Sequence, residues 1–153
     1  HRNFQGYCTT RTTGQVYGFG ASSISQLFSA YSQNVKNAAQ YIKNINDKNT
    51  AVLRGYKLNQ NEKITREVIN SIMCNYYVDF SELAKKFETD VDTIKDNVGF
   101  SNDKFEDFIN LNFMKIENDK IIISNKARLY IRNIAMEFDP LLNEKIGTYS
   151  KTI

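Results

Sequence analysis

The apolar residues between positions 59 and 76 recur every three to four positions, which is the period of an α-helix. They would form one wide apolar face: Ile64, Val68, Ile69, Ile72, Met73 and Tyr76. Asn59 precedes Glu62 by three residues, a spacing typical of the capping box at a helix N-terminus. Because a face this wide needs neighbours on more than one side, we expect later elements to pack against this helix.

After this helix the pattern predicts short helices and one β-hairpin. Asp79 and Glu82 have the spacing of a second capping box, which opens a helix ending at Phe87. The further elements expected are helices at 91–98 and 103–112, hairpin strands at 113–117 and 120–124, and a last helix from about Asn125 with the apolar face Ala127, Tyr130, Ile131, Ile134 and Phe138. This order of elements is typical of a winged-helix domain.

The residues before position 59 predict short strands and one helix. Strand-like segments at 3–9 and 16–21 are joined by a polar loop. They contain three glycines, which indicate bulges, close approach of the backbone to another group, or only relief of crowding: Gly6, Gly18 and Gly20. Two strands are not stable alone, so we expect them to belong to a larger sheet. Residues 26–34 show no clear period, 35–46 predict an amphipathic helix, and 51–58 predict an extended segment.

Composition places the chain among soluble globular proteins, with 41% hydrophobic and 24% charged residues in 153. No apolar run approaches membrane-spanning length and nothing resembles a signal peptide, so we expect a cytoplasmic protein with no membrane partner. Cys8 and Cys74 indicate a reducing compartment and are too few to hold zinc or an iron–sulfur cluster. Since the chain begins at His1 in strand-like sequence, we expect it to be part of a longer protein.

The charge distribution weighs against a nucleic-acid partner. Residues 1–78 hold nine Lys/Arg against three Asp/Glu, whereas 79–107 hold four against nine. Residues 81–94 resemble a helix-turn-helix, but its second helix has Asp90, Asp92 and Asp96 against a single Lys95, and carboxylates repel phosphates. These charges disfavour DNA binding. We keep a stand-alone winged-helix interaction or nucleic-acid-binding module as the alternative to the function that the family resemblance below implies.

Seven blocks in order resemble the C-terminal part of oxygen-independent coproporphyrinogen III oxidase (dehydrogenase). They are HRNFQGY at 1–7, GFGASSIS at 18–25, YSQN at 31–34, RGY at 54–56, REVI at 66–69, IMCN at 72–75 and IRNIAMEFD at 131–139, and the closing SKTI is also similar. The related haem-chaperone branch usually lacks the first block, which favours the oxidase. The spacing from Gly6 to Gly18 is one residue longer than is common in the family.

This resemblance implies a radical S-adenosylmethionine oxidoreductase of haem and porphyrin biosynthesis. Such an enzyme binds a [4Fe–4S] cluster through Cys-x3-Cys-x2-Cys, forms a 5′-deoxyadenosyl radical, and oxidatively decarboxylates two propionates of coproporphyrinogen III to vinyl groups, giving protoporphyrinogen IX. The cluster motif is absent from these residues, so we expect no metal site or bound cofactor here and no turnover by this fragment alone. The expected partners are coproporphyrinogen III and the missing N-terminal barrel, in a monomeric parent enzyme.

The resemblance also implies an α+β, mostly helical fold in three parts. Residues 1–34 would be the last strands of an incomplete (β/α) barrel, 35–58 a connecting helix and extended linker, and 59–153 a helical, winged-helix-like domain with a small β-hairpin.

Three positions match functional sites of the family. Phe4 and Gln5 match active-site positions, and Ile24 matches a contact to S-adenosylmethionine. The Gln5 amide is suited to hydrogen-bond a carboxylate or ribose, and Ile24 is suited to pack on the adenine. The residues alone would favour an ordinary barrel core for Phe4 and Ile24, and the resemblance reverses that preference.

Arginines are the natural partners of a tetracarboxylate substrate, because a guanidinium binds a carboxylate through two hydrogen bonds. The candidates are Arg2, Arg54, Arg66 and Arg132, and each could equally form an interdomain salt bridge. Arg128 and Arg132 lie one helical turn apart and are also candidates to bind the barrel.

Overall fold

A computed structural model describes residues 2–3, 6–7, 15–140 and 142. The chain divides into two compact units, one formed by residues 9–63 and the other by residues 1–8 with 64–153. The described residues form helices and small antiparallel sheets, as the predicted α+β class requires.

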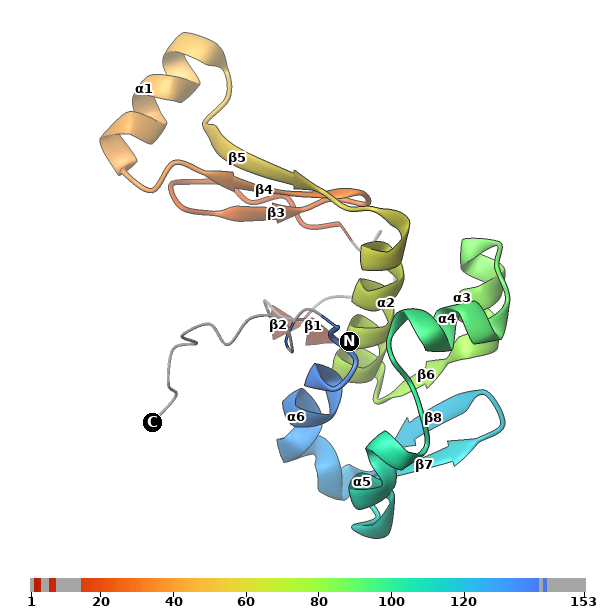
Figure 1. Cartoon of the computed structure of the whole chain (residues 1–153). Helices are drawn as coiled ribbons and strands as arrows, with labels where there is room; N and C mark the ends of the chain where they lie inside the picture. The colour runs from red at the N-terminus through yellow and green to blue at the C-terminus, as the bar shows by residue number, and fades with distance from the viewer. Residues whose placement is uncertain (1, 4–5, 8–14, 141, 143–153) are drawn as a thin grey trace. The chain divides into compact units, whose positions relative to one another are not determined.

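The unit of residues 9–63 is built on a three-stranded antiparallel sheet. Its strands are β3 (Ile24–Gln26), β4 (Ala30–Asn34) and β5 (Val52–Lys57), in that spatial order, and helix α1 (Ala38–Lys48) connects β4 to β5 (Figure 1). The Asn37 side chain caps α1 by accepting a hydrogen bond from the Gln40 amide at 2.9 Å. The buried apolar side chains described in this unit are Val35, Ala51 and Leu58, so much of its apolar surface remains exposed.

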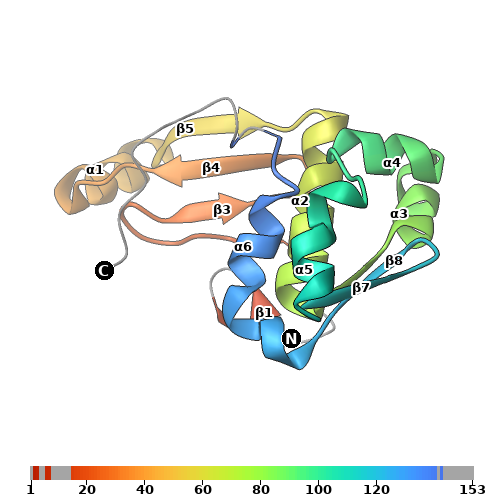
Figure 2. The same ribbon diagram turned by 60° about the horizontal axis from the view of Figure 1, so that its bottom comes forward.

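The second unit is mostly helical and contains another small sheet. Most of α2 (Gln60–Asn75) belongs to it, followed by β6 (Tyr77–Asp79), α3 (Phe80–Phe87) and α4 (Val91–Asn97). A 3₁₀ turn η1 (Asp103–Phe105) leads into α5 (Glu106–Asn110), and the hairpin strands β7 (Met114–Glu117) and β8 (Lys120–Ile123) precede η2 (Asn125–Tyr130) and α6 (Ile131–Met136) (Figure 2). The sheet order is β6-β8-β7. Backbone pairing also joins β1 (Arg2–Asn3) to β2 (Gly6–Tyr7).

The core of this unit lies against the predicted face of α2. Ile64, Val68 and Ile72 are almost completely buried, as are residues from most of the later elements: Val78, Phe80, Ile94, Val98, Phe105, Ile121, Ile134 and Phe138. The rings of Phe105 and Phe138 stack with their centroids 4.6 Å apart. The prediction that later elements pack on this helix is therefore confirmed.

The predicted capping box at Asn59 and Glu62 is present, and the Asp79 side chain caps the second predicted helix start. The Asn59 side chain accepts from the Glu62 amide at 2.9 Å, and Glu62 accepts in return from the Asn59 amide at 2.8 Å. Asp79 accepts from the amides of Ser81 and Glu82 at 3.0 and 3.2 Å and so begins α3. These bonds satisfy amides at the helix starts that have no partner inside their helices.

Several predicted elements differ from those observed. Residues 16–21 do not form a strand: Val16 makes one isolated bridge to Gln26, and the chain then turns through Gly20 at φ 96° and Ser22 at φ 62°. The strand predicted at 3–9 is observed as the separate strands β1 and β2, and the polar loop before Gly14 lies outside the described residues.

Three further elements differ from the prediction in type or position. All of β4 and the last residue of β3 fall in the stretch at 26–34 that showed no period. Helix α1 begins and ends two to three residues later than predicted, while the extended segment at 51–58 is confirmed as β5. The last helix begins as the 3₁₀ element η2 and becomes α-helical only at Ile131.

Candidate functional site

The segment from Gly18 to Ser25, here called the glycine–serine loop, has a tightly defined backbone. A Cβ atom on Gly18 would lie 2.7 Å from the Ile24 carbonyl oxygen, so no other residue fits there without moving the backbone. The Gly18 amide donates to Ser25 Oγ at 3.0 Å. Close backbone approach, one of the reasons considered for the glycines, is therefore confirmed at Gly18, while Gly20 supplies a positive φ.

Asn34 holds this loop from the end of β4. Its Nδ2 donates to the Gly20 carbonyl and to Ser23 Oγ, both at 3.0 Å, and lies 3.4 Å from the Gly18 carbonyl oxygen. The Asn34 amide donates to the Ser23 carbonyl at 3.0 Å. One side chain thus satisfies several loop groups, a role that sequence analysis did not assign to it. The signal available for it was the YSQN block.

Ile24 lies at the end of the glycine–serine loop and starts β3. Its side chain is 47% exposed, so it is accessible to a ligand and is not part of an internal core of this unit. In the sheet register Ile24 is opposite Gln33, and Gln33 is opposite Arg54. Directly opposed residues of antiparallel strands point to the same face, so these three side chains form one row across the sheet.

Two of the residues in this row are joined directly. Gln33 Oε1 accepts from Arg54 Nε at 2.9 Å and from Arg54 Nη2 at 2.6 Å. On its other side Gln33 Nε2 donates to the Ser22 carbonyl at 3.4 Å. The glycine–serine loop is therefore linked to the arginine through a single neutral side chain.

The next row of the same sheet face contains tyrosines. Tyr31 is opposite Tyr56, whose hydroxyl donates to the Glu62 carboxylate. This bond and the amide of Asn59 hold the pKa of Glu62 below its usual range, and the bond to the carboxylate raises the pKa of Tyr56. Glu62 is therefore a carboxylate at neutral pH, fixed at the junction of β5 and α2.

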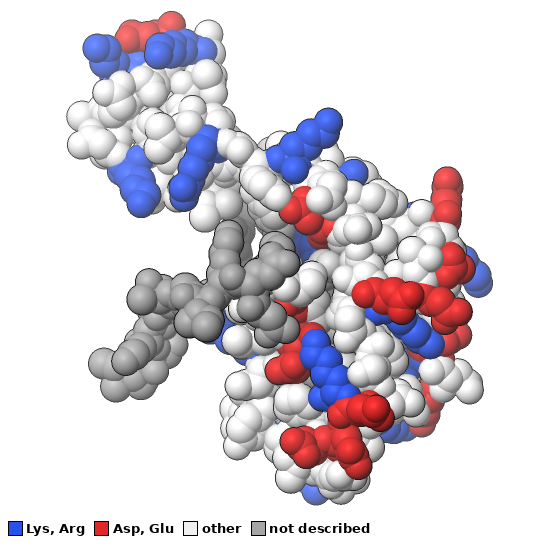
Figure 3. Space-filling model, viewed as in Figure 1, with Lys and Arg blue, Asp and Glu red and all other residues white. Residues whose placement is uncertain are grey.

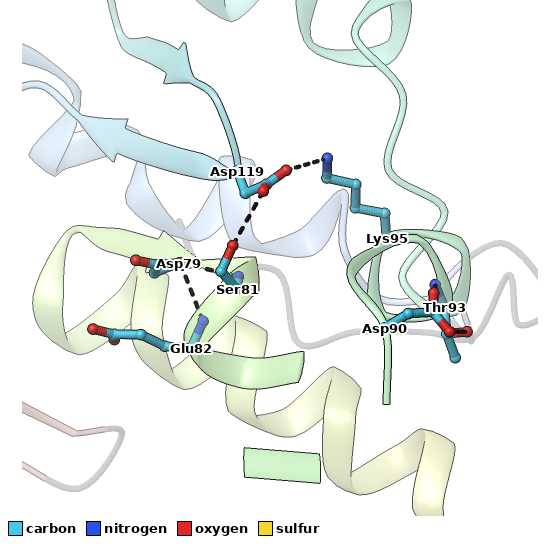
Figure 4. A network of polar contacts seen from close by, with 7 residues as sticks. All are labelled: Asp79, Ser81, Glu82, Asp90, Thr93, Lys95 and Asp119. Atoms are coloured by element: carbon cyan, nitrogen blue, oxygen red, sulfur yellow. Dashed lines mark hydrogen bonds and ion pairs between the residues drawn. The ribbon is translucent and has the colours of Figure 1, made fainter. Parts of the chain in front are cut away.

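A separate polar network joins helices α3 and α4 to the hairpin turn (Figure 4). Asp119 accepts from Lys95 Nζ at 2.8 Å and from Ser81 Oγ at 3.1 Å, which hold the pKa of its carboxyl below the usual range. Asp90 caps α4 by accepting from the Thr93 amide at 2.7 Å, and this bond lowers the pKa of Asp90. These contacts join elements of one unit, and we assign them a structural role.

The charges around α4 are those of a poor phosphate binder. Lys95, the cation of this helix, is already paired with Asp119. Acidic side chains gather over the helical unit on the face seen in Figure 3. Among the described residues the predicted helix-turn-helix therefore offers phosphates no basic surface on α4.

The remaining candidate residues are dispersed. Arg66 is half-buried on α2, and Arg132 is exposed on α6. The Arg128 guanidinium lies over the Tyr76 ring at 4.7 Å, a cation–π contact within the helical unit. Phe4 and Gln5 lie outside the described residues, as does the side chain of Arg2.

No metal-binding group is evident in the described part of the chain, where no three His, Cys, Asp or Glu side chains converge. Cys74 is half-buried on α2, and Cys8 lies outside the described residues. No helix among the described residues is long and apolar enough to span a membrane.

A solved structure that this fold resembles belongs to a radical SAM enzyme. It is coproporphyrinogen III oxidase (HemN) from Escherichia coli, which matches 92% of this chain with a TM-score of 0.77 and 32% sequence identity, while the chain covers 32% of that structure. No protein-family model matches the chain.

Curated relatives agree with the structural match. The oxygen-independent coproporphyrinogen III oxidase of Escherichia coli is 33% identical over 95% of this chain, and those of Thermostichus vulcanus and Helicobacter pylori are 32% and 31% identical over 99%. The chain spans 31%, 46% and 32% of these three proteins. The resemblance predicted from the sequence blocks is thus confirmed: the chain is similar, along nearly its whole length, to the C-terminal portion of oxygen-independent coproporphyrinogen III oxidases.

Proposed function

We propose that this chain is the C-terminal portion of an oxygen-independent coproporphyrinogen III oxidase. The complete enzyme would oxidatively decarboxylate two propionates of coproporphyrinogen III to vinyl groups and so produce protoporphyrinogen IX. The observation that carries this proposal is the similarity to the Escherichia coli enzyme over 95% of the chain, at 33% identity. No comparison supports the alternative of a stand-alone winged-helix interaction or nucleic-acid-binding module.

The cofactors of such an enzyme would be S-adenosylmethionine and a [4Fe–4S] cluster. Two cysteines far apart in the sequence do not fit a cluster that needs three or four thiolates, so the cluster would be held by the rest of the enzyme. Ile24 would contact S-adenosylmethionine, and its 47% exposure supports this role. Phe4 and Gln5 would belong to the active site.

The fold proposal follows the three predicted parts. Residues 1–34 would complete a barrel begun by preceding sequence, 35–58 would connect it, and 59–153 would be a winged-helix-like domain. Exposed apolar side chains in the unit of residues 9–63 support packing against further protein: Tyr17, Phe19, Phe28, Ile42 and Leu53 are each at least 59% exposed. The sheet β6-β8-β7 with α3 and α4 supports the winged-helix-like part.

The partners proposed are coproporphyrinogen III and the remaining barrel, with no nucleic acid and no membrane. The complete enzyme would be a cytoplasmic monomer. Arg2, Arg54, Arg66 and Arg132 remain the candidates for the substrate carboxylates.

The sequence of the reading frame upstream of His1 tests this proposal. Because the chain spans 31% of the Escherichia coli relative, we expect about two thirds of the enzyme to be encoded upstream, including Cys-x3-Cys-x2-Cys. A start codon directly before His1 would contradict the proposal, as would an upstream frame without those cysteines.

A further inference from the structure

The position of Arg54 in the sheet distinguishes it from the other candidate arginines. Arg54 stands in the same cross-strand row as Ile24, with only Gln33 between them. Neighbouring strands lie about 4.8 Å apart, so the backbones at Ile24 and Arg54 are about 10 Å apart. Arg66 and Arg132 are on helices α2 and α6, outside this sheet. Arg54 is therefore the candidate that shares a cross-strand row with the residue proposed to contact S-adenosylmethionine.

Gln33 fixes the direction of the Arg54 side chain. A single oxygen, Gln33 Oε1, accepts from both Nε and Nη2, which engages one edge of the guanidinium. The Gln33 amide group is itself oriented by the Ser22 carbonyl, which accepts from Nε2. Because the amide presents its oxygen to the arginine and its nitrogen to a carbonyl, its orientation is defined from both sides.

The second edge of the guanidinium remains available for a ligand. Arginine has five N–H donors, and the edge formed by Nη1 and Nη2 suits a carboxylate bound through two hydrogen bonds. Among the described residues no carboxylate forms an ion pair with Arg54, and the partner that it has, Gln33, is neutral. A neutral partner orients the cation without cancelling its charge.

We propose that Arg54 binds a propionate carboxylate of the substrate and that Gln33 is the positioning residue that holds it for this role. This inference rests on the proposed function, since the tetracarboxylate is the substrate of that function. It assigns to Gln33 a role that neither the sequence blocks nor the relatives' names specify. The cross-strand row would then bring a substrate carboxylate beside Ile24.

The test measures binding of coproporphyrin III, the stable tetracarboxylate porphyrin, to the complete protein by fluorescence quenching. Arg54→Gln should raise its Kd about tenfold to a hundredfold, and Arg54→Lys should restore part of the affinity. Gln33→Glu should also raise the Kd about tenfold, because the new carboxylate would occupy the guanidinium. Gln33→Met, which removes the acceptor without adding charge, should have a smaller effect in the same direction.

Lys57→Gln is the matched control. Lys57 is on the same strand and also exposed, but strand alternation places it on the opposite sheet face from Arg54. The Lys57→Gln variant should bind coproporphyrin III with the same Kd as the wild type. In all five variants the Kd for S-adenosylmethionine and the melting temperature should remain close to the wild-type values. If Gln33 or Arg54 had a merely structural role, its substitution would change these two quantities as well.

The outcomes separate this inference from the function on which it rests. If the wild type binds coproporphyrin III and Arg54→Gln binds it equally well, the inference is overturned and the proposed function stands. If Arg54→Gln weakens binding but Gln33→Glu does not, the positioning role of Gln33 is overturned. A wild-type protein that binds no coproporphyrin III would overturn the proposed function as well.

Discussion

Lys120 Nζ lies 2.8 Å from Asp79 Oδ2, so the hairpin strand β8 is joined to the residue that caps helix α3. The Asp79 side chain is only 5% exposed. Burial raises the pKa of Asp79, but the bonds from Lys120 and from the amides of Glu82 and Ser81 outweigh it and hold the pKa below its usual range. One carboxylate therefore joins a helix start to the sheet.

Removing this carboxylate should destabilise the helical unit at neutral pH. Asp79→Ala should lower the free energy of unfolding by about 1–2 kcal/mol, the usual range for a lost N-cap. Because the folded-state pKa is depressed, the stabilisation is complete above the unfolded pKa of about 3.9 and is lost as pH falls through the folded value. Urea unfolding at pH 7 and pH 3 should show the difference from wild type shrinking at acid pH.

Asp107→Asn is the control for this experiment. Asp107 is exposed in the first turn of α5 and lacks the pair that Asp79 makes. The Asp107→Asn substitution should change the free energy of unfolding very little at either pH. An Asp79→Ala deficit that is equally large at pH 3 would contradict the assignment of the effect to the carboxylate.

The aromatic stack of the core should be the most sensitive part of the helical unit. Phe138 is completely buried and stacks on Phe105 and Phe100. Phe138→Ala should cost about 3–5 kcal/mol of unfolding free energy, because it removes a large buried side chain and leaves a cavity. Leu129→Ala, at a position 91% exposed, should cost almost nothing. Equal losses in thermal unfolding would contradict the observed core.

The glycine–serine loop should not accept a side chain at Gly18. Gly18→Ala would place a Cβ 2.7 Å from the Ile24 carbonyl oxygen, and the loop backbone would have to move. We expect faster amide exchange at Ser22 and Ser25 and weaker binding of S-adenosylmethionine by the complete protein. Gly55→Ala is the matched control: its Cβ would make an ordinary contact at 3.5 Å with the Tyr31 carbonyl oxygen, and it should leave both measurements unchanged.

Asn34 should be needed for the same loop. Asn34→Ala removes the donor shared by the Gly20 carbonyl and Ser23 Oγ, and it should destabilise the unit of residues 9–63 by about 1–3 kcal/mol. Asn34→Asp should be at least as damaging, since a carboxylate would face carbonyl oxygens. Hydrogen exchange at Ser22, whose amide donates to the Val35 carbonyl, measures this effect locally. Protection equal to wild type in both variants would show that the loop does not depend on Asn34.

Local signals were enough to predict much of the helical unit. Capping at Asn59 and Asp79 involves residues two or three positions apart, so spacing alone revealed both helix starts. The hairpin and the face of α2 were found for the same reason. The sheet of the other unit could not be predicted this way, because β4 is defined by pairing with β5 across a helix. Its Tyr, Ser, Gln and Asn residues have no alternating pattern.

The site was only partly accessible from the sequence. Ile24 and Arg54 entered through a family resemblance, but nothing local indicated that Gln33 lies between them. That relationship depends on the register of three strands, with Ile24 opposite Gln33 and Gln33 opposite Arg54. The roles of Phe4 and Gln5 stay predictions, since these residues lie outside the described part of the chain.

The central claim is tested most directly by anaerobic turnover of the complete protein. After reconstitution with iron and sulfide, it should convert coproporphyrinogen III to protoporphyrinogen IX in the presence of S-adenosylmethionine, a reductant and an electron acceptor. Two carbon dioxide molecules should be released for each product formed. A protein that binds its cluster and cleaves S-adenosylmethionine but leaves coproporphyrinogen III unchanged would contradict the account.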